Sequence, residues 1–283
     1  MLTTNARQSL TLTNCPTDSF WFSRWSKGCE TRMGYILKQD KAISLDLLKA
    51  LISSFSNEIL NCSQSKTEKL NLVNGLAYTA IMFGGSFRGS EGLKLDLKAL
   101  IKDFEKGNSD SHKHPHVVIP LQGRFKGEAG EQCHLIPLSN VSASGIRFRD
   151  AVTLLVKFRE NFTLNNPWGF VNQEGNKLSF SEMNEIFLEG LDHVKDQDTN
   201  NSLGLADVDI REQYNINRSF CRGSSTHAQN MNVPEPVINA HNRWRKTEMA
   251  KKKRRQNFSM IENYADIELL IPTLIQYSAM VNS

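Results

Sequence analysis

The chain has 283 residues, enough to bury a sizeable core in one large or two small domains. Its net charge of +4 is compatible with a nucleic-acid partner without indicating one. Five scattered cysteines without a CxxC pair argue against a zinc site and a disulfide framework, and no apolar stretch approaches the ~18 residues that a membrane span needs.

The sequence of the N-terminal half predicts a polar segment followed by two amphipathic helices. Residues 1–30 are rich in Thr, Ser and Asn, and we interpret them as a linker or the remnant of an N-terminal domain. Ser44 is placed to cap a helix that runs to about residue 59. A second helix over 66–83 is expected to end at Gly84-Gly85.

The middle of the chain predicts one hairpin between further helices. Two strands, 117–121 and 132–136, are separated by a glycine-rich loop at 127–130. Ser179 and Glu182 have the spacing of a capping box. The fold class is therefore mostly α with a small antiparallel β-sheet (α+β). The remaining expected elements are helices at 148–162, 179–194, 223–232, 234–242 and 260–264, a polar acidic loop at 196–209, and an apolar tail helix at 266–281 that Pro272 interrupts.

Basic residues gather in one short stretch near the C-terminus. Such a run is typical of a solvated loop, and it also suits contacts to the DNA backbone or a nuclear-import signal in a eukaryote. With Arg222, the candidate DNA-binding residues are Arg243, Arg245, Lys246, Lys251, Lys252, Lys253, Arg254 and Arg255.

Four short patterns follow one another in a specific order. An arginine after a helix end, with an acid three residues on, occurs in Gly85-Ser-Phe-Arg-Gly-Ser-Glu91. A basic turn enters a small-residue helix in Arg218-Ser-Phe-Cys-Arg-Gly-Ser-Ser-Thr226. An indole lies beside arginines in His241-Asn-Arg-Trp-Arg-Lys246, and a lone tyrosine occupies Met260-Ile-Glu-Asn-Tyr-Ala265.

In this order the patterns resemble the catalytic domain of the tyrosine recombinases, the phage-integrase family, over residues 31–283. The second and third patterns are similar to the corresponding segments of family members from mobile elements of eukaryotes and their viruses. The resemblance implies a DNA strand transferase that needs neither cofactor nor metal, because a tyrosine attacks phosphorus and stores the bond energy in a 3′-phosphotyrosine.

The resemblance also implies a role for each matched residue. Tyr264 would be the nucleophile. Arg88 would clamp the phosphate with its planar fork, and Glu91 would support it. Lys126, on the expected hairpin loop, would protonate the leaving 5′-oxygen, and Trp244 would contact the phosphate.

One position departs from the family pattern, because Cys221 stands where a second clamping arginine is expected. The interval of 23 residues from Cys221 to Trp244 matches the family spacing and favours this register. The rival register places Arg218 in the arginine slot. A neutral thiol cannot neutralise a phosphate, so loss of the arginine is expected to cost on the order of 10²–10³ in rate, unless Arg218 partly replaces it.

Three functions remain open from the sequence. The first is an integrase-type recombinase that binds double-stranded DNA and assembles as a homotetramer through the tail helix. The second is a catalytically inactive, domesticated DNA-binding protein, which Cys221 favours. The third is a relaxing enzyme resembling type IB topoisomerases. We expect an intracellular protein without a membrane segment, nuclear if eukaryotic.

Overall fold

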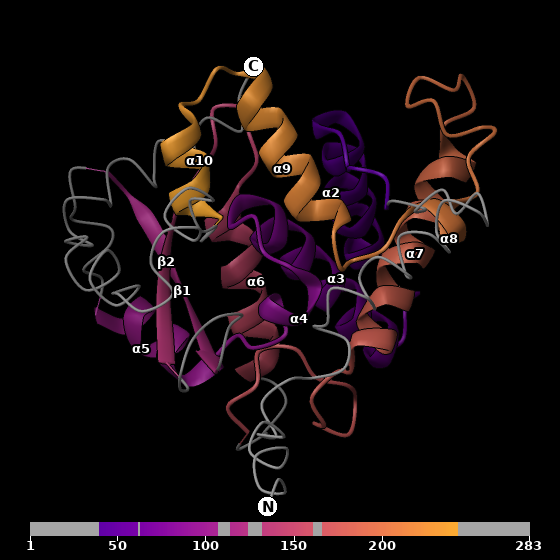
Figure 1. Cartoon of the computed structure of the whole chain (residues 1–283). Coiled ribbons are helices and arrows are strands. Elements are labelled where there is room, and N and C mark those ends of the chain that lie inside the picture. The colour runs from indigo at the N-terminus through magenta and orange to yellow at the C-terminus, as the bar shows by residue number, and fades with distance from the viewer. Residues whose placement is uncertain (1–39, 62, 107–113, 124–131, 161–165, 243–283) are drawn as a thin grey trace, which may run out of the picture. The chain divides into compact units, whose positions relative to one another are not determined.

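The computed structural model describes residues 40–61, 63–106, 114–123, 132–160 and 166–242, and it confirms the predicted class (Figure 1). Helices dominate, and the described strands form one antiparallel pair. None of the helices in this described part is long and apolar enough to cross a bilayer. In chain order the elements are α2 (Leu45–Leu60), α3 (Lys66–Gly84), α4 (Gly89–Gly92), α5 (Leu97–Lys106), β1 (His116–Gly123), β2 (Gln132–Ser139), α6 (Phe148–Glu160), α7 (Phe180–Gln197), α8 (Ile210–Gln213), α9 (Ser219–Asn230) and α10 (Glu235–His241).

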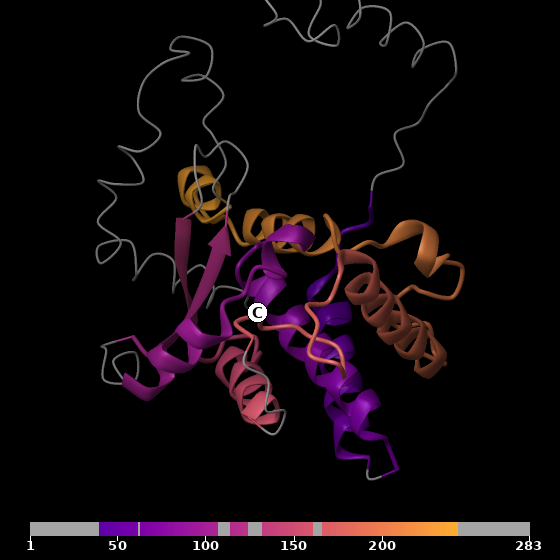
Figure 2. The same ribbon diagram turned by 90° about the horizontal axis from the view of Figure 1, so that it is seen from below.

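Helix α3 is the centre of the packing. Almost every residue from Leu70 to its C-terminal end is buried, because α2, α6, α7 and α9 all pack against it (Figures 1 and 2). A capping box fixes its start: the Ser65 hydroxyl accepts from the Glu68 N–H, and the Glu68 carboxylate accepts from the Ser65 N–H. The buried C-terminal end of α3 leads directly into the turn that carries Arg88.

Two glycines let α2, α3 and α7 approach closely around the ring of Phe55. A Cβ on Gly75 would lie 2.8 Å from Cζ of Phe55, and one on Gly190 would lie 2.6 Å from the same atom. A side chain at either position would therefore push the helices apart. This contact keeps α7, and the residues that lead into it, fixed relative to α3.

The sheet is extended on one side by the segment that follows α4. β1 pairs with β2 along its whole length, from His116 opposite Ser139 to Gly123 opposite Gln132. On the other side of β1, Leu95 bridges to Leu121, and the neighbouring Asp96 bridges to Trp168. The chain between α4 and α5 therefore lies against the hairpin and ties it to the Arg88 turn.

Several boundaries differ from those expected. Helices α4, α5 and α8 were not predicted, and α9 begins at Ser219, four residues before the expected start. The short elements α4 and α8 have too few residues to show a period. α5 is initiated by Asp96, whose carboxylate accepts from the Ala99 N–H at 3.0 Å. The helix at 260–264 and the tail helix lie outside the described residues.

Candidate functional site

Arg88 immediately precedes α4 and is held by contacts to its own turn. The Glu91 carboxylate accepts from the backbone N–H of Arg88 at 3.0 Å. The fully buried Tyr78 hydroxyl donates to the carbonyl of Gly89 at 2.9 Å, and burial raises the pKa of this phenol well above its ordinary range. The position of the half-buried Arg88 is thus set by two contacts: Tyr78 of α3 holds the next residue, and Glu91 holds the Arg88 backbone.

The Arg88 turn is packed directly on the segment that leads to Arg218. The Gly89 N–H donates to the carbonyl of Asn217 at 3.4 Å. A Cβ on Gly89 would lie 2.9 Å from the carbonyl oxygen of Ile216 and 2.8 Å from Cε2 of Phe180. Only glycine permits this approach, so the residue after Arg88 brings the two arginine-bearing patterns into contact.

Helix α9 begins at Ser219 and is seated closely on the N-terminal part of the described chain. The Ser219 hydroxyl accepts from the Asn215 N–H at 3.1 Å and so closes the turn before the helix. A Cβ on Gly223 would lie only 2.2 Å from the carbonyl oxygen of Ile43. This seating leaves Arg218 exposed at the N-terminus of α9 and Arg222 half-buried one turn on.

Cys221 is 8% exposed, and its side chain lies among the charged groups of both patterns. Burial raises the pKa of the thiol. The positive charges of Arg88 and Arg218 and the Arg222 N–H oppose this rise, whereas the Glu91 carboxylate adds to it. The thiol lies 3.4 Å from the carbonyl oxygen of Arg218. The structure therefore brings Arg88, Glu91, Arg218 and Cys221 together, with an uncharged thiol among them.

A buried polar network, which the sequence did not predict, joins the two patterns. The hydroxyls of Ser86 and Ser225 both donate to the Cys221 carbonyl, at 3.4 and 2.6 Å. Ser86 has a φ of +51°, in the left-handed region that non-glycine residues rarely occupy. The turn before Arg88 is therefore fixed directly to the backbone of Cys221.

The end of α10 joins the same network. The Asn242 amide donates to the Ser225 hydroxyl at 3.0 Å, and Nε2 of His241 lies 3.0 Å from the Gly84 carbonyl oxygen. Both side chains are almost fully buried. One hint is visible in the sequence, since His241 and Asn242 directly precede the arginine and indole of the third pattern. The chain thus reaches residue 242 beside both Cys221 and the Arg88 turn.

The other predicted site residues lie outside the described part of the chain. β1 ends at Gly123 and β2 begins at Gln132, and residues 124–131 between them are not described. The residues concerned are the candidate acid Lys126, Trp244 and Tyr264, and the basic residues Arg243, Arg245, Lys246, Lys251, Lys252, Lys253, Arg254 and Arg255.

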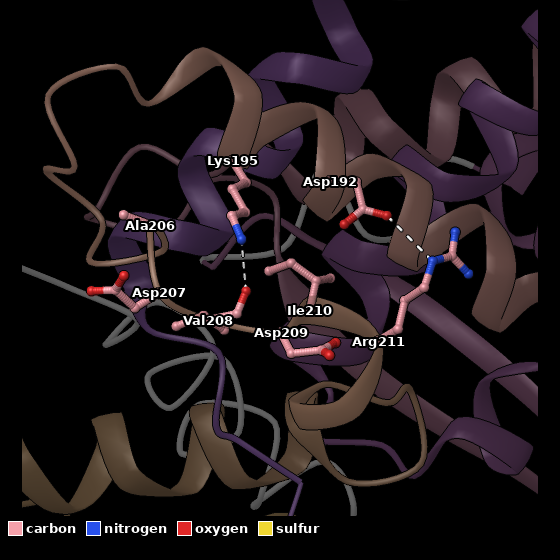
Figure 3. Close-up of a pocket in the computed structure, with 8 residues that line it drawn as sticks. All are labelled: Asp192, Lys195, Ala206, Asp207, Val208, Asp209, Ile210 and Arg211. Atoms are coloured by element: carbon pink, nitrogen blue, oxygen red, sulfur yellow. Dashed lines mark hydrogen bonds and ion pairs between the residues drawn. The ribbon is translucent and has the colours of Figure 1, made fainter.

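A hollow between α7 and residues 206–211 lies elsewhere and contains no predicted site residue (Figure 3). Arg211 pairs with Glu185 at 2.6 Å and with Asp192 at 3.5 Å, and Lys195 donates to the Val208 carbonyl. The cations here are thus engaged, and Asp207 and Asp209 add further negative charge. Such a surface repels a polyanion, so the cluster around Cys221 is the better candidate site.

Comparison with known proteins finds similarity among solved structures only. No protein-family profile matches the chain, and no curated protein does. The chain is similar to crystal structures of the XerH site-specific recombinase bound to its difH substrate. The post-cleavage complex with palindromic difH has a TM-score of 0.48 at 14% identity, and the pre-cleavage complex has a TM-score of 0.49 at 13%. The matches cover 83% of this chain but only 55% and 56% of those chains.

Proposed function

We propose that the protein binds double-stranded DNA and that the cluster of Arg88, Arg218 and Cys221 receives a backbone phosphate. One observation carries the proposal. Two arginine-bearing patterns, whose segments lie 135 positions apart at Ser86 and Cys221, meet through specific hydrogen bonds and glycine contacts. Guanidinium forks match the geometry of phosphate oxygens, so two of them at one place suit a phosphodiester.

The reaction that fits this site is cleavage and rejoining of DNA through a 3′-phosphotyrosine. In this proposal Tyr264 attacks the phosphorus, Lys126 gives a proton to the leaving 5′-oxygen, and Trp244 supports the phosphate. No metal or nucleotide cofactor takes part. The position of Asn242 in the buried network favours this reaction, because Trp244 follows only two residues later in the sequence. The tail helix 266–281 would join subunits into a tetramer on DNA.

Cys221 favours a second function, DNA binding with weak or absent cleavage. The thiol is buried within the electrostatic reach of both arginines, and burial keeps it neutral at pH 7. It therefore adds no charge where a third positive group would stabilise a pentavalent phosphate. The loss of one such group typically costs on the order of 10²–10³ in rate. Binding is less affected, because Arg88 and Arg218 still supply two positive charges.

Duplex binding by the full chain tests the first part of the proposal. We expect affinity for a labelled duplex to fall steeply as salt rises, because bound phosphates release counterions. The double variant Arg88→Gln/Arg218→Gln should bind at least tenfold more weakly at ~0.1 M salt. The matched control is Arg147→Gln, which removes an exposed arginine that pairs with the nearby Asp150. Equal binding by wild type and double variant would refute the assignment.

Covalent trapping separates the two functions. A nicked duplex should trap wild-type protein on DNA if cleavage occurs, and Tyr264→Phe should abolish the adduct. Duplex binding without any adduct supports the DNA-binding protein. An adduct that persists in Tyr264→Phe would remove this tyrosine from the mechanism.

A further inference from the structure

Lys94 connects the Arg88 turn to the end of β1 that leads into the hairpin loop. Its N–H donates to the Glu91 carbonyl at 2.9 Å, and its own carbonyl accepts from the Gln122 N–H at 2.9 Å. Its side chain passes Gly123, where a Cβ would lie 3.3 Å from Cδ and 3.5 Å from Nζ of the lysine. The ammonium group is therefore held at the end of β1.

Lys177 provides a second cation close to Lys94. Its Nζ lies 4.0 Å from the centre of the Trp168 ring, a distance typical of a cation–π contact. The tryptophan is fixed in turn, because the next residue, Gly169, donates its N–H to the Leu95 carbonyl at 2.9 Å. Partial burial, and then the positive charge of Lys94, lower the pKa of Lys177. The two ammonium groups therefore repel each other across adjoining segments.

This pair of lysines adjoins the surface that carries Arg88. Phe180, three residues after Lys177, lies against Gly89, where a Cβ would be 2.8 Å from its ring, and remains 37% exposed. The start of α7 therefore packs on α4.

We infer that Lys94 and Lys177, with Trp168 beneath the latter, form a second phosphate-binding surface that holds the DNA backbone next to the Arg88 site. The inference rests on the proposed DNA-binding function and names residues beyond it. Two like charges held close together cost free energy in the unbound protein, and neighbouring backbone phosphates bound at the two ammonium groups remove the repulsion. Lysine suits such a contact because it binds phosphate as a point charge.

The alternative is that Lys177 only packs on Trp168 to stabilise the loop before α7. The two interpretations differ in their dependence on salt. A packing role changes the free energy of unfolding and leaves the number of counterions released on DNA binding unaltered. A phosphate contact contributes about 0.9 to the slope of log affinity against log salt concentration.

The test is a salt series of duplex binding with the full chain. We expect Lys94→Gln and Lys177→Gln each to lower the slope by about one, and the double variant by about two. Lys177→Arg keeps both the charge and the stacking and should retain the wild-type slope. The control is Lys66→Gln, which removes an exposed lysine at the opposite end of α3 from Gly84, roughly 27 Å away at 1.5 Å per residue.

Three results of this salt series would overturn the inference. A double variant with the wild-type slope overturns this inference and leaves the proposed function intact. The same loss of slope in Lys177→Arg as in Lys177→Gln also overturns it, because charge would then not be the property that matters. If the wild-type protein does not bind duplex DNA at all, the proposed function and this inference both fail.

Discussion

The Ser86 hydroxyl donates a hydrogen bond of 3.4 Å to the backbone carbonyl of Cys221, 135 positions along the chain. The Ser225 hydroxyl donates to the same carbonyl at 2.6 Å. Cys221 thus serves as a backbone anchor for the turn before Arg88, whatever its side chain does. The position that the family resemblance assigns to a second arginine is also the position on which the two patterns are joined.

Ser225→Ala should loosen this junction. The change removes the donor to the Cys221 carbonyl and the acceptor for the buried Asn242 amide. Because a buried polar group left without a partner costs about 1–3 kcal/mol, we expect the free energy of unfolding to fall by about that amount. Urea unfolding measures it. The matched control is Thr226→Ala on the exposed side of the same helix, which should change stability by about 0.5 kcal/mol or less.

Gly89→Ala should disturb both stability and DNA binding. A Cβ at this position would lie 2.9 Å from the Ile216 carbonyl oxygen, so the Arg88 turn must move away from the segment before Arg218. Overpacking of this kind costs about 1–3 kcal/mol. We expect weaker duplex binding as well, measured by anisotropy, because the arginines separate. Ser90→Ala, one residue on and exposed, is the control; equal effects of the two changes would contradict the close contact.

The Cys221 thiol should make stability depend on pH in the alkaline range. Burial raises its pKa in the folded protein above that of the unfolded chain, near 8.5. The folded state then holds the proton more tightly, so this contribution is complete below about pH 8.5 and is lost as pH rises through the folded pKa. The Cys221→Ala variant has no thiol at this position and therefore lacks this pH-dependent contribution to stability.

Unfolding by urea across pH 7 to 10 measures this contribution as the difference between wild type and Cys221→Ala. Groups common to both proteins, such as Cys133 and Tyr78, whose pKa values burial also raises, cancel in this difference. We expect the wild type to lose stability faster above about pH 8.5. A difference that stays constant with pH would show that the thiol does not titrate abnormally.

The sequence predicted the elements whose signals are local. Ser44 caps α2 as expected, accepting from the Leu47 N–H, and Ser179 forms its capping box with Glu182. The hairpin strands include both segments predicted as strands, 117–121 and 132–136. These features depend on residues three or four positions apart, or on short apolar runs joined by a glycine-rich loop, which a sequence displays directly.

The polar junction of the candidate site could not be predicted in the same way. Ser86, Ser225 and Asn242 are unremarkable in the sequence, and only the tertiary packing of α3, α9 and α10 makes them partners. The same holds for Gly89 and Gly223, since their need for glycine comes from the carbonyls of Ile216 and Ile43. The resemblance assigned the Arg88 and Arg218 patterns to one site, while the contacts that join these two patterns required the structure.

The central claim is that Cys221 occupies the position of a phosphate-clamping arginine in a DNA strand transferase. The most direct test is Cys221→Arg, assayed on a pool of nicked duplexes with randomised sequence around the nick. We predict that the covalent adduct rises on the order of 10²-fold or more over wild type, and that Cys221→Arg/Tyr264→Phe forms none. A Cys221→Arg protein that folds and binds duplex DNA but gains no adduct would contradict the claim.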